Sequence, residues 1–354
     1  MLRPRPTKLI FGWLPALLGL ALVASVMGAV DQETPEMFYG DTSRLGRPFA
    51  KDPSVVRFKG RYLMYHSLPP AKGDGKPNGW TAGIAESPDL VHWTKVGEVL
   101  PQHDYESNGL AAPDAIVLDG KVHLFYQTYG NRSRNAICHA VSDDGVHFER
   151  NESNPIFRPE GEWTVGRAID AEPFAHDGRL LLYWATRDPS MKIQMLGVAG
   201  APLDGDYSRD EWTQLCDGPI LKPTLPWEKR CTEAATLCEH DGWLYMFYAG
   251  GYNNDPQQVG CAVSRDGVEW QRLSQKPLLP NGPPDSWNSS ESGHPDVFID
   301  RDGRGYLFFQ GNDDNGHTWH LSKMHLRFDG RLPYLVRPRD GKEFHLQDPT
   351  FPGQ

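Results

Sequence analysis

Four side chains suited to acid–base chemistry stand at matching places in the sequence. Asp52 and Asp170 each precede a turn glycine by eight residues, and Glu233 and His294 precede theirs by nine. Converging carboxyl groups raise one another's pKa values, and a fold tolerates that cost where chemistry or a cation uses it. A pair with one carboxyl ionised and the other protonated can cleave a glycosidic bond.

The turn glycines belong to an internal repeat that must position these side chains. Each glycine is followed by an apolar, largely aromatic run, and the copies are 58 to 64 residues apart. They begin at Gly60, Gly120, Gly178, Gly242 and Gly303. A second pattern, Ser-x-Asp-Gly followed by an aromatic residue, lies between copies, as in residues 142–148 and 264–270. Glycine there supplies the positive φ of a tight turn.

Each repeat therefore predicts a strand, a turn, a strand, a connection, a strand, a turn and a strand. Five such units predict an all-β fold, a five-bladed β-propeller with four antiparallel strands per blade. A two-sheet sandwich is the alternative, but it does not explain the constant period. In a propeller the innermost strands line a central channel, so the acids and His294 should converge although they are far apart in sequence.

The composition agrees with a turn-rich globular protein. The chain has 354 residues, including 36 glycines, 30 prolines, 11 tryptophans, 13 tyrosines and 15 phenylalanines. This aromatic content argues against disorder. The formal net charge of −10 argues against a nucleic-acid partner. A single apolar run long enough to span a bilayer argues against a polytopic membrane protein.

That apolar run lies at the N-terminus and has the features of a secretory signal. Arg3, Arg5 and Lys8 precede apolar residues 9–29, and small residues close the run. An uncleaved anchor is the alternative. We expect a signal peptide at 1–29, a catalytic propeller at 30–340 and a C-terminal tail at 341–354. The protein would then be secreted or periplasmic, with no membrane partner after cleavage.

The cysteines give no metal-binding pattern. They are Cys138, Cys216, Cys231, Cys238 and Cys261, and none forms a CxxC pair. An exported chain could form one disulfide, for which Cys231 and Cys238 are nearest in sequence. We expect most of the cysteines to be small buried apolar residues.

The blade segments resemble those of the five-bladed β-propeller glycoside hydrolases, in particular glycoside hydrolase family 43; families 32, 62, 68, 117 and 130 share the fold. Asp52-Pro53-Ser54-Val55-Val56 is similar to the segment with the general base. Ile169-Asp170 resembles the segment whose acid tunes the general acid, and Glu233 resembles that general acid. Gly293-His294 resembles the segment whose histidine faces a central calcium.

Two departures from the family pattern affect this assignment. Ala171-Glu172-Pro173 follows Asp170 where the family has Ile-Asp-Pro, so Glu172 competes for the modulating role. Glu233-Ala234-Ala235 stands where Glu-Gly-Pro is usual.

Further residues are candidates for substrate binding. Arg187 could contact a sugar hydroxyl or carboxylate, although a strand-end salt bridge explains it equally well. Trp80 lies in a connection, where an aromatic ring can stack on a sugar face. The other candidates are Asp114, Asn108 and Asn312.

These observations predict an inverting glycoside hydrolase that acts on plant or algal oligosaccharides or polysaccharides. Asp52 would activate water, Glu233 would protonate the leaving oxygen and Asp170 would orient Glu233. The chemistry requires no cofactor, and calcium in the central channel would be structural. The alternatives are a phosphorylase or transferase, which would need a cationic pocket, and a non-catalytic carbohydrate-binding propeller.

Overall fold

The computed structural model describes residues 36–71 and 79–352, which belong to one compact unit. The predicted signal peptide at 1–29 lies outside the described residues. In the part of the chain that is described, no helix has the length and apolar character needed to cross a membrane.

The described residues form five antiparallel sheets, each built from consecutive strands. The first blade contains β1 (Lys51–Phe58), β2 (Arg61–Leu68), β3 (Thr81–Ser87) and β4 (Thr94–Val99). The second contains β5 (Leu110–Leu118), β6 (Lys121–Thr128), β7 (Ile137–Ser142) and β8 (Glu149–Arg150). The third contains β9 (Ile169–His176), β10 (Arg179–Arg187), β11 (Gln194–Pro202) and β12 (Thr213–Gln214).

The last two blades complete the ring. The fourth contains β13 (Thr232–His240), β14 (Trp243–Gly250), β15 (Gln258–Ser264) and β16 (Gln271–Arg272). The fifth contains β17 (Glu291–Ile299), β18 (Gly305–Asn312), β19 (His320–Asp329), β20 (Leu332–Val336) and β21 (Glu343–His345). Helical structure in the described residues is limited to short 3₁₀ turns at Asp104–Glu106, Arg132–Arg134 and Arg209–Glu211.

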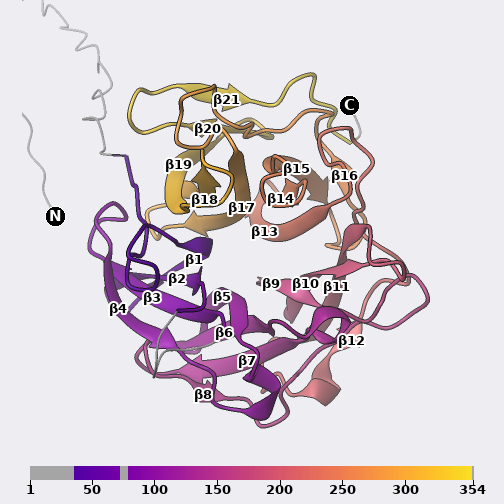
Figure 1. The fold of residues 1–354 in the computed structure, drawn as a ribbon. Helices are drawn as coiled ribbons and strands as arrows, with labels where there is room; N and C mark the ends of the chain where they lie inside the picture. Colours follow the sequence, from indigo (N-terminus) through magenta and orange to yellow (C-terminus); the bar gives the residue numbers. More distant parts are fainter. Residues whose placement is uncertain (1–35, 72–78, 353–354) are drawn as a thin grey trace, which may run out of the picture. The chain divides into compact units, whose positions relative to one another are not determined.

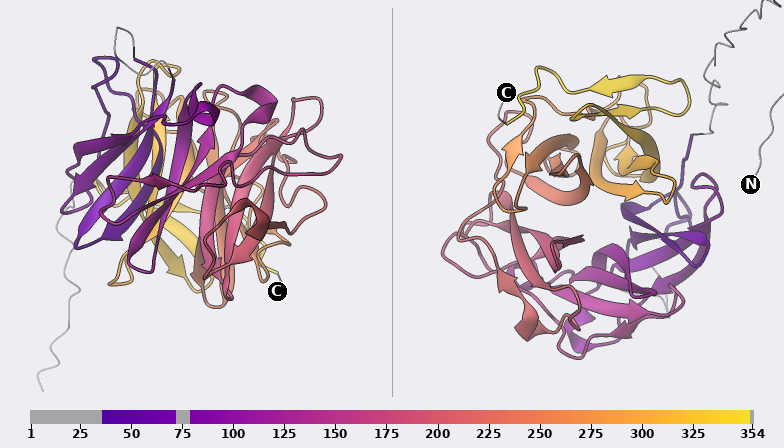
Figure 2. Two further views of the ribbon diagram at one scale, coloured as in Figure 1. Left: turned by 90° about the horizontal axis from the view of Figure 1, so that it is seen from below. Right: turned by 180° about the vertical axis from the view of Figure 1, so that it is seen from behind.

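The sheets stand around a common centre (Figure 1). The innermost strands β1, β5, β9, β13 and β17 contact one another in that order, and β17 contacts β1. Residues before β1 close the ring, because Tyr39 pairs with Leu321 of the fifth blade. Figure 2 shows β20 and β21 at the outer edge of that blade. The five-bladed propeller is confirmed, and its fifth sheet carries one strand more than predicted.

The repeated glycines make the innermost hairpin turns. Gly60, Gly120, Gly178 and Gly242 have φ between 68° and 85°, and the residue before each also has positive φ. Two successive residues with positive φ are the signature of a type I′ turn, whose twist matches that of the flanking strands. The repeat therefore sets the register between the first two strands of the first four blades.

Adjacent blades are joined by packing and by a repeated hydrogen bond. The Tyr65 hydroxyl of the first blade donates to the Gly145 carbonyl of the second at 2.8 Å, and Tyr183 donates to Gly267 at 2.9 Å. Both glycines belong to the Ser-x-Asp-Gly turns. The five cysteines are free and buried, so the suggested disulfide between Cys231 and Cys238 is absent.

Candidate active site

A bulge at the same place in every innermost strand positions the side chains that face the channel. The pairing register shifts at this place in all five blades. The bulged residues all have φ between 43° and 53°: Asp52, Ala112, Asp170, Ala234 and His294. Such φ values are uncommon outside glycine, and bulges with positive φ are frequent at active sites. Glu233 immediately precedes the bulged residue of its blade.

Side chains of neighbouring blades hold these bulges in place. The backbone N–H of Asp52 donates to Gln310 at 2.9 Å, and that of Asp170 donates to Gln127 at 2.7 Å. The N–H of Ala112 donates to the Ser67 hydroxyl at 2.7 Å. Each of these three bulges is thus fixed by the blade that precedes it in the ring.

The bulges open into a cavity of about 550 Å³. Asp52, Asp170 and Glu233 line it together with Trp80, Arg187 and His294, so the structure brings six of the nine predicted site residues to one place. The three acids are at most 8% exposed. They are therefore shielded from water, apart from the cavity that they face.

Asp52 has the environment of an ionised base. Its carboxylate lies 3.2 Å from Nδ1 of His294 and 3.8 Å from Nζ of Lys51. Burial alone would raise the pKa of Asp52, but the charges of His294 and Lys51 outweigh it and hold that pKa below its usual value. Asp52 is therefore a carboxylate at neutral pH.

The surroundings of Asp170, beside Glu233, shift its pKa in the opposite direction to that of Asp52. Burial, followed by the charges of Glu233 and Asp52, raises the pKa of Asp170 well above its usual value. Glu233 accepts hydrogen bonds from the side-chain amides of Gln194 and, at 2.6 Å, Gln257. The pair thus holds a proton beside an oriented carboxyl group, while Asp52 across the channel stays charged.

An aromatic wall lines another part of the cavity. Trp80 lies against Phe49 and Tyr129, with ring centroids 5.9 Å and 5.6 Å apart. The Lys51 ammonium lies 4.6 Å from the ring centroid of Trp319. Trp80 is half-buried. Such a wall suits the apolar face of a sugar ring.

Three predicted substrate-binding residues do not line this cavity. Asn108 is exposed and donates to Asn131 at 2.8 Å. Asn312 is fully buried; its amide donates to Asn254 at 3.1 Å, and its oxygen accepts the N–H of Gly316. Its contacts are those of a residue that fixes a loop. Asp114 lies two positions beyond the bulge of its strand, in a second ring.

This second ring ties the innermost strands together. At 2.8–3.0 Å, its side chains accept backbone N–H groups of the next blade from Val55, Ala115, Leu237 and Val297. The acceptors are Asp296, Ser54, Glu172 and Thr236. The corresponding donor for Asp114 would be residue 173, which is a proline. Asp114 instead accepts from Ser54 at 2.9 Å and shares a hydrogen bond with Glu172.

Asp114, Glu172 and Asp296 offer carboxylate oxygens that lie within 4.8 Å of one another. Hard cations such as Ca²⁺ prefer oxygen ligands, so the donor set fits calcium in kind. Six to eight oxygens are typical for Ca²⁺, so water would have to complete the shell. His294 lies outside this group and faces Asp52 instead.

Several lining or supporting residues were missed by the sequence interpretation. Gln127 and Gln310 each stand seven residues after a turn glycine, as Ser67 does. The repeat therefore marks these positions as equivalent, and they could have been predicted from it. Gln194 begins β11, and Gln257 immediately precedes β15. No motif marks these two glutamines, because their role depends on the proximity of the third and fourth blades.

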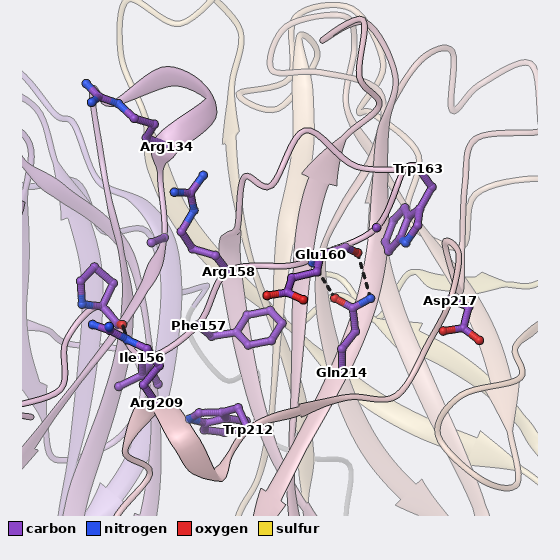
Figure 3. Close-up of a pocket in the computed structure, with 13 residues that line it drawn as sticks. Arg134, Ile156, Phe157, Arg158, Glu160, Trp163, Arg209, Trp212, Gln214 and Asp217 are labelled. Carbon is purple, nitrogen blue, oxygen red and sulfur yellow. Dashed lines mark hydrogen bonds between the residues drawn. The ribbon is translucent and has the colours of Figure 1, made fainter.

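A second cavity of about 790 Å³, which we call the outer cavity, is lined in part by the segment that leads to β9. Figure 3 shows Arg134, Arg158 and Trp163 at its wall, with Glu160 bonded to Gln214 through its backbone. None of the predicted site residues lines it. The smaller cavity with the three buried acids is therefore the candidate active site.

Most of the chain is similar in sequence to known proteins. Residues 45–332 match the model of Glycosyl hydrolases family 43. The chain is 26% identical over 284 residues to alpha-L-arabinofuranosidase 43 of Humicola insolens, covering 73% of this chain and 55% of that protein. It is 27% identical over 208 residues to a 1,2-beta-oligomannan phosphorylase of a Thermoanaerobacter species, covering 56% of this chain and 64% of that protein. The chain thus spans less than two thirds of either relative.

Solved structures share the fold. A thermostable family-43 glycoside hydrolase superposes with a TM-score of 0.66 at 22% identity, covering 88% of this chain and 98% of that one. An endo-1,4-beta-xylanase from Bacteroides thetaiotaomicron gives 0.64 at 22% identity, covering 84% and 96%. At these identities the likeness establishes the propeller and leaves the substrate open.

Proposed function

The chain belongs to the glycosyl hydrolases of family 43, and from that premise we propose that it hydrolyses glycosidic bonds of plant or algal oligosaccharides or polysaccharides with inversion at the anomeric carbon. The observation that carries the proposal is the contrast between two parts of one cavity. The His294 and Lys51 charges lower the pKa of Asp52, whereas burial and the neighbouring Glu233 raise the pKa of Asp170, so the Asp170–Glu233 pair retains a proton that Asp52 does not.

In the proposed reaction, Asp52 accepts a proton from water as that water attacks the anomeric carbon. Glu233 donates a proton to the departing glycosidic oxygen. Gln194 and Gln257 fix the orientation of Glu233. The proton that the Asp170–Glu233 pair retains lies on Glu233 in the reactive form, and its loss to the glycosidic oxygen leaves Glu233 as a carboxylate. Glu172 is a poor candidate for the modulating role, because its carboxyl bonds to Asp114 and to the N–H of Leu237 in the second ring.

The relatives suggest a pentose as the sugar residue. One is named an arabinofuranosidase and a structural neighbour is named a xylanase. The half-buried ring of Trp80 would provide a stacking surface for such a sugar.

A panel of aryl arabinofuranosides, xylosides and galactosides tests the proposal, with the product anomer followed by NMR. We expect release of the aryl group with an initial product of inverted configuration. Retained configuration would contradict the inverting mechanism. Saturable glycan binding without any cleavage would contradict the hydrolase and indicate a non-catalytic carbohydrate-binding propeller.

Phosphorolysis is a second candidate because arginines line the cavity and one relative is named a phosphorylase. In that reaction a phosphate oxygen would attack the anomeric carbon while the leaving oxygen takes the proton of Glu233. Product formation that requires inorganic phosphate and yields a sugar 1-phosphate would identify it.

Two further proposals concern the protein's environment. We propose secretion or periplasmic export, on the basis of residues 1–29, to be tested by N-terminal sequencing of the exported protein. We also propose structural calcium at Asp114, Glu172 and Asp296, because their oxygens converge. A melting temperature that does not rise with Ca²⁺ would contradict this.

A further inference from the structure

Two arginines in the catalytic cavity have an unusual set of partners. Arg167 and Arg187 both line the cavity, and both donate to the side-chain oxygen of Gln194, at 2.9 Å and 3.0 Å. Arg167 is 8% exposed. Burial, followed by the charge of Arg187, lowers the pKa of Arg167. A buried guanidinium whose close partner is a neutral amide is costly, so its retention requires a reason.

The lysines of the same region are paired differently. Lys51 lies 3.8 Å from Asp52, and Lys229 lies 2.9 Å from Asp255. Neither Arg167 nor Arg187 has a carboxylate oxygen within 4.0 Å among the described residues. The positive charge of the arginine pair is thus not neutralised by direct contact.

The surroundings of Arg187 keep the pair at the cavity. Arg187 lies over the ring of Tyr252, 5.2 Å from its centroid, and Arg230 lies 5.8 Å from the same centroid. Tyr252 itself lines the cavity, and burial raises its pKa to about 12, so the ring stays neutral. Two guanidinium groups, those of Arg167 and Arg187, therefore line one side of the cavity, and the exposed Arg230 lies near the same tyrosine ring.

The position of this cluster relates it to the catalytic acid. Gln194 accepts from both arginines and donates to Glu233, so the cluster is one side chain away from the proposed proton donor. The aromatic wall comes from the first, second and fifth blades, whereas Arg167, Arg187 and Gln194 come from the third blade and its entry segment. The cavity thus has an aromatic part and a cationic part.

We propose that Arg167 and Arg187 form an oxyanion-binding subsite beside Glu233, which takes either the carboxylate of an acidic sugar residue or inorganic phosphate. The planar fork of a guanidinium matches both groups, and such charge-assisted bonds are stronger than neutral ones. Neutral hydroxyl groups could be bound by amides and aromatic rings without this charge. The inference rests on the proposed function, because it names the class of ligand that the same cavity accepts.

Binding measurements on the full chain test the subsite without relying on turnover. Calorimetry would compare glucuronate and galacturonate with glucose and galactose, and would titrate inorganic phosphate separately. We expect a uronate to bind about tenfold more tightly than its neutral counterpart, or phosphate to bind, since a bond between charged groups contributes that much. Uronate preference would assign the site to an acidic glycan, and phosphate binding would assign it to phosphate.

Variants of Arg187 test whether this side chain binds the anion. R187Q should weaken anion binding about tenfold. R187K, which keeps the charge but loses the fork, should weaken it less and serves if R187Q does not fold. R134Q is the matched control, because Arg134 is exposed and lines the outer cavity (Figure 3). An equal loss in R134Q, or no anion binding tighter than the neutral sugars, would overturn the proposal.

Activity on neutral aryl glycosides separates the two hypotheses. Hydrolysis of a neutral glycoside without any anion preference would reject the subsite and keep the glycosidase. Anion binding that depends on Arg187, in a chain that cleaves no glycoside, would reject the glycosidase and keep the subsite.

Discussion

Asp52 and Glu233 differ in surroundings, and this difference predicts two losses of activity without loss of structure. Because asparagine tolerates positive φ, D52N keeps the bulge at φ 53° while it removes the base. E233Q keeps the side-chain shape and removes the proton donor, although its NH2 group cannot accept the second of the two amide hydrogen bonds. We expect turnover to fall about 10²- to 10⁴-fold in each variant, with melting temperatures near wild type. Wild-type turnover in either variant would exclude that residue, and D217N in the outer cavity is the control.

Lys51 contributes to the acidity of Asp52, and this predicts a change in pH dependence. The Lys51 ammonium lies 3.8 Å from the Asp52 carboxylate, whose pKa it helps to lower. K51M removes the charge but keeps an unbranched apolar stem over Trp319. The pKa of Asp52 should rise, so the acidic limb of the kcat/KM profile should move up by about 1 pH unit. An unmoved limb would mean that another group sets it.

The sequence predicted that Asp52, Asp170 and Glu233 lie together, because the repeat carries them at similar distances from a turn glycine, and the three side chains do line one cavity. It could not separate Asp114 from them, although Asp114 lies two positions farther along its strand and faces Glu172 rather than the cavity. The reason is the bulge, which reverses the side-chain alternation of a strand locally and has no sequence signature of its own.

The innermost strands depend on side-chain acceptors that join neighbouring blades. The fully buried Thr236 hydroxyl accepts the N–H of Val297 at 2.9 Å. T236V keeps the side-chain shape and leaves that buried N–H without its partner. We expect the free energy of unfolding to fall by about 1–3 kcal/mol in urea denaturation. T94V, at an exposed position of β4, should change it by less than about 0.5 kcal/mol. Equal effects would show that the inter-blade bond contributes little.

The fold as a whole could be predicted from the sequence because the same pattern occurs in five copies, and each copy indicates the same unit. Gly60, Gly120, Gly178, Gly242 and Gly303 specify the hairpins, and the Tyr65–Gly145 bond shows how one repeat is joined to the next. The fifth blade shows the limit of this argument. Its outer strands β20 and β21 carry no copy of the pattern, so a tail was expected from residue 341, yet Glu343–His345 pairs with β20.

The channel through the ring concentrates acids whose protonation must affect the stability of the fold. Pro173 offers no N–H to Asp114, which therefore bonds to Ser54 and to the Glu172 carboxyl. Burial raises the pKa of Asp114 to about 7. An unfolded aspartate titrates near 3.9, so the folded state binds the proton more tightly. The resulting stability is complete below about pH 4 and is lost as the pH rises through 7.

The melting temperature in EDTA should therefore fall between pH 5 and pH 8. D114N keeps the side-chain shape and cannot ionise. It should melt at least about 3 °C above wild type at pH 8, and its own fall from pH 5 to pH 8 should be smaller. The fall should not vanish, because burial also raises the pKa values of Glu172 and Asp296. D104N, at an exposed acid, should follow the wild type. If D114N loses as much stability as wild type over this range, the proton that stabilises the channel does not reside on Asp114.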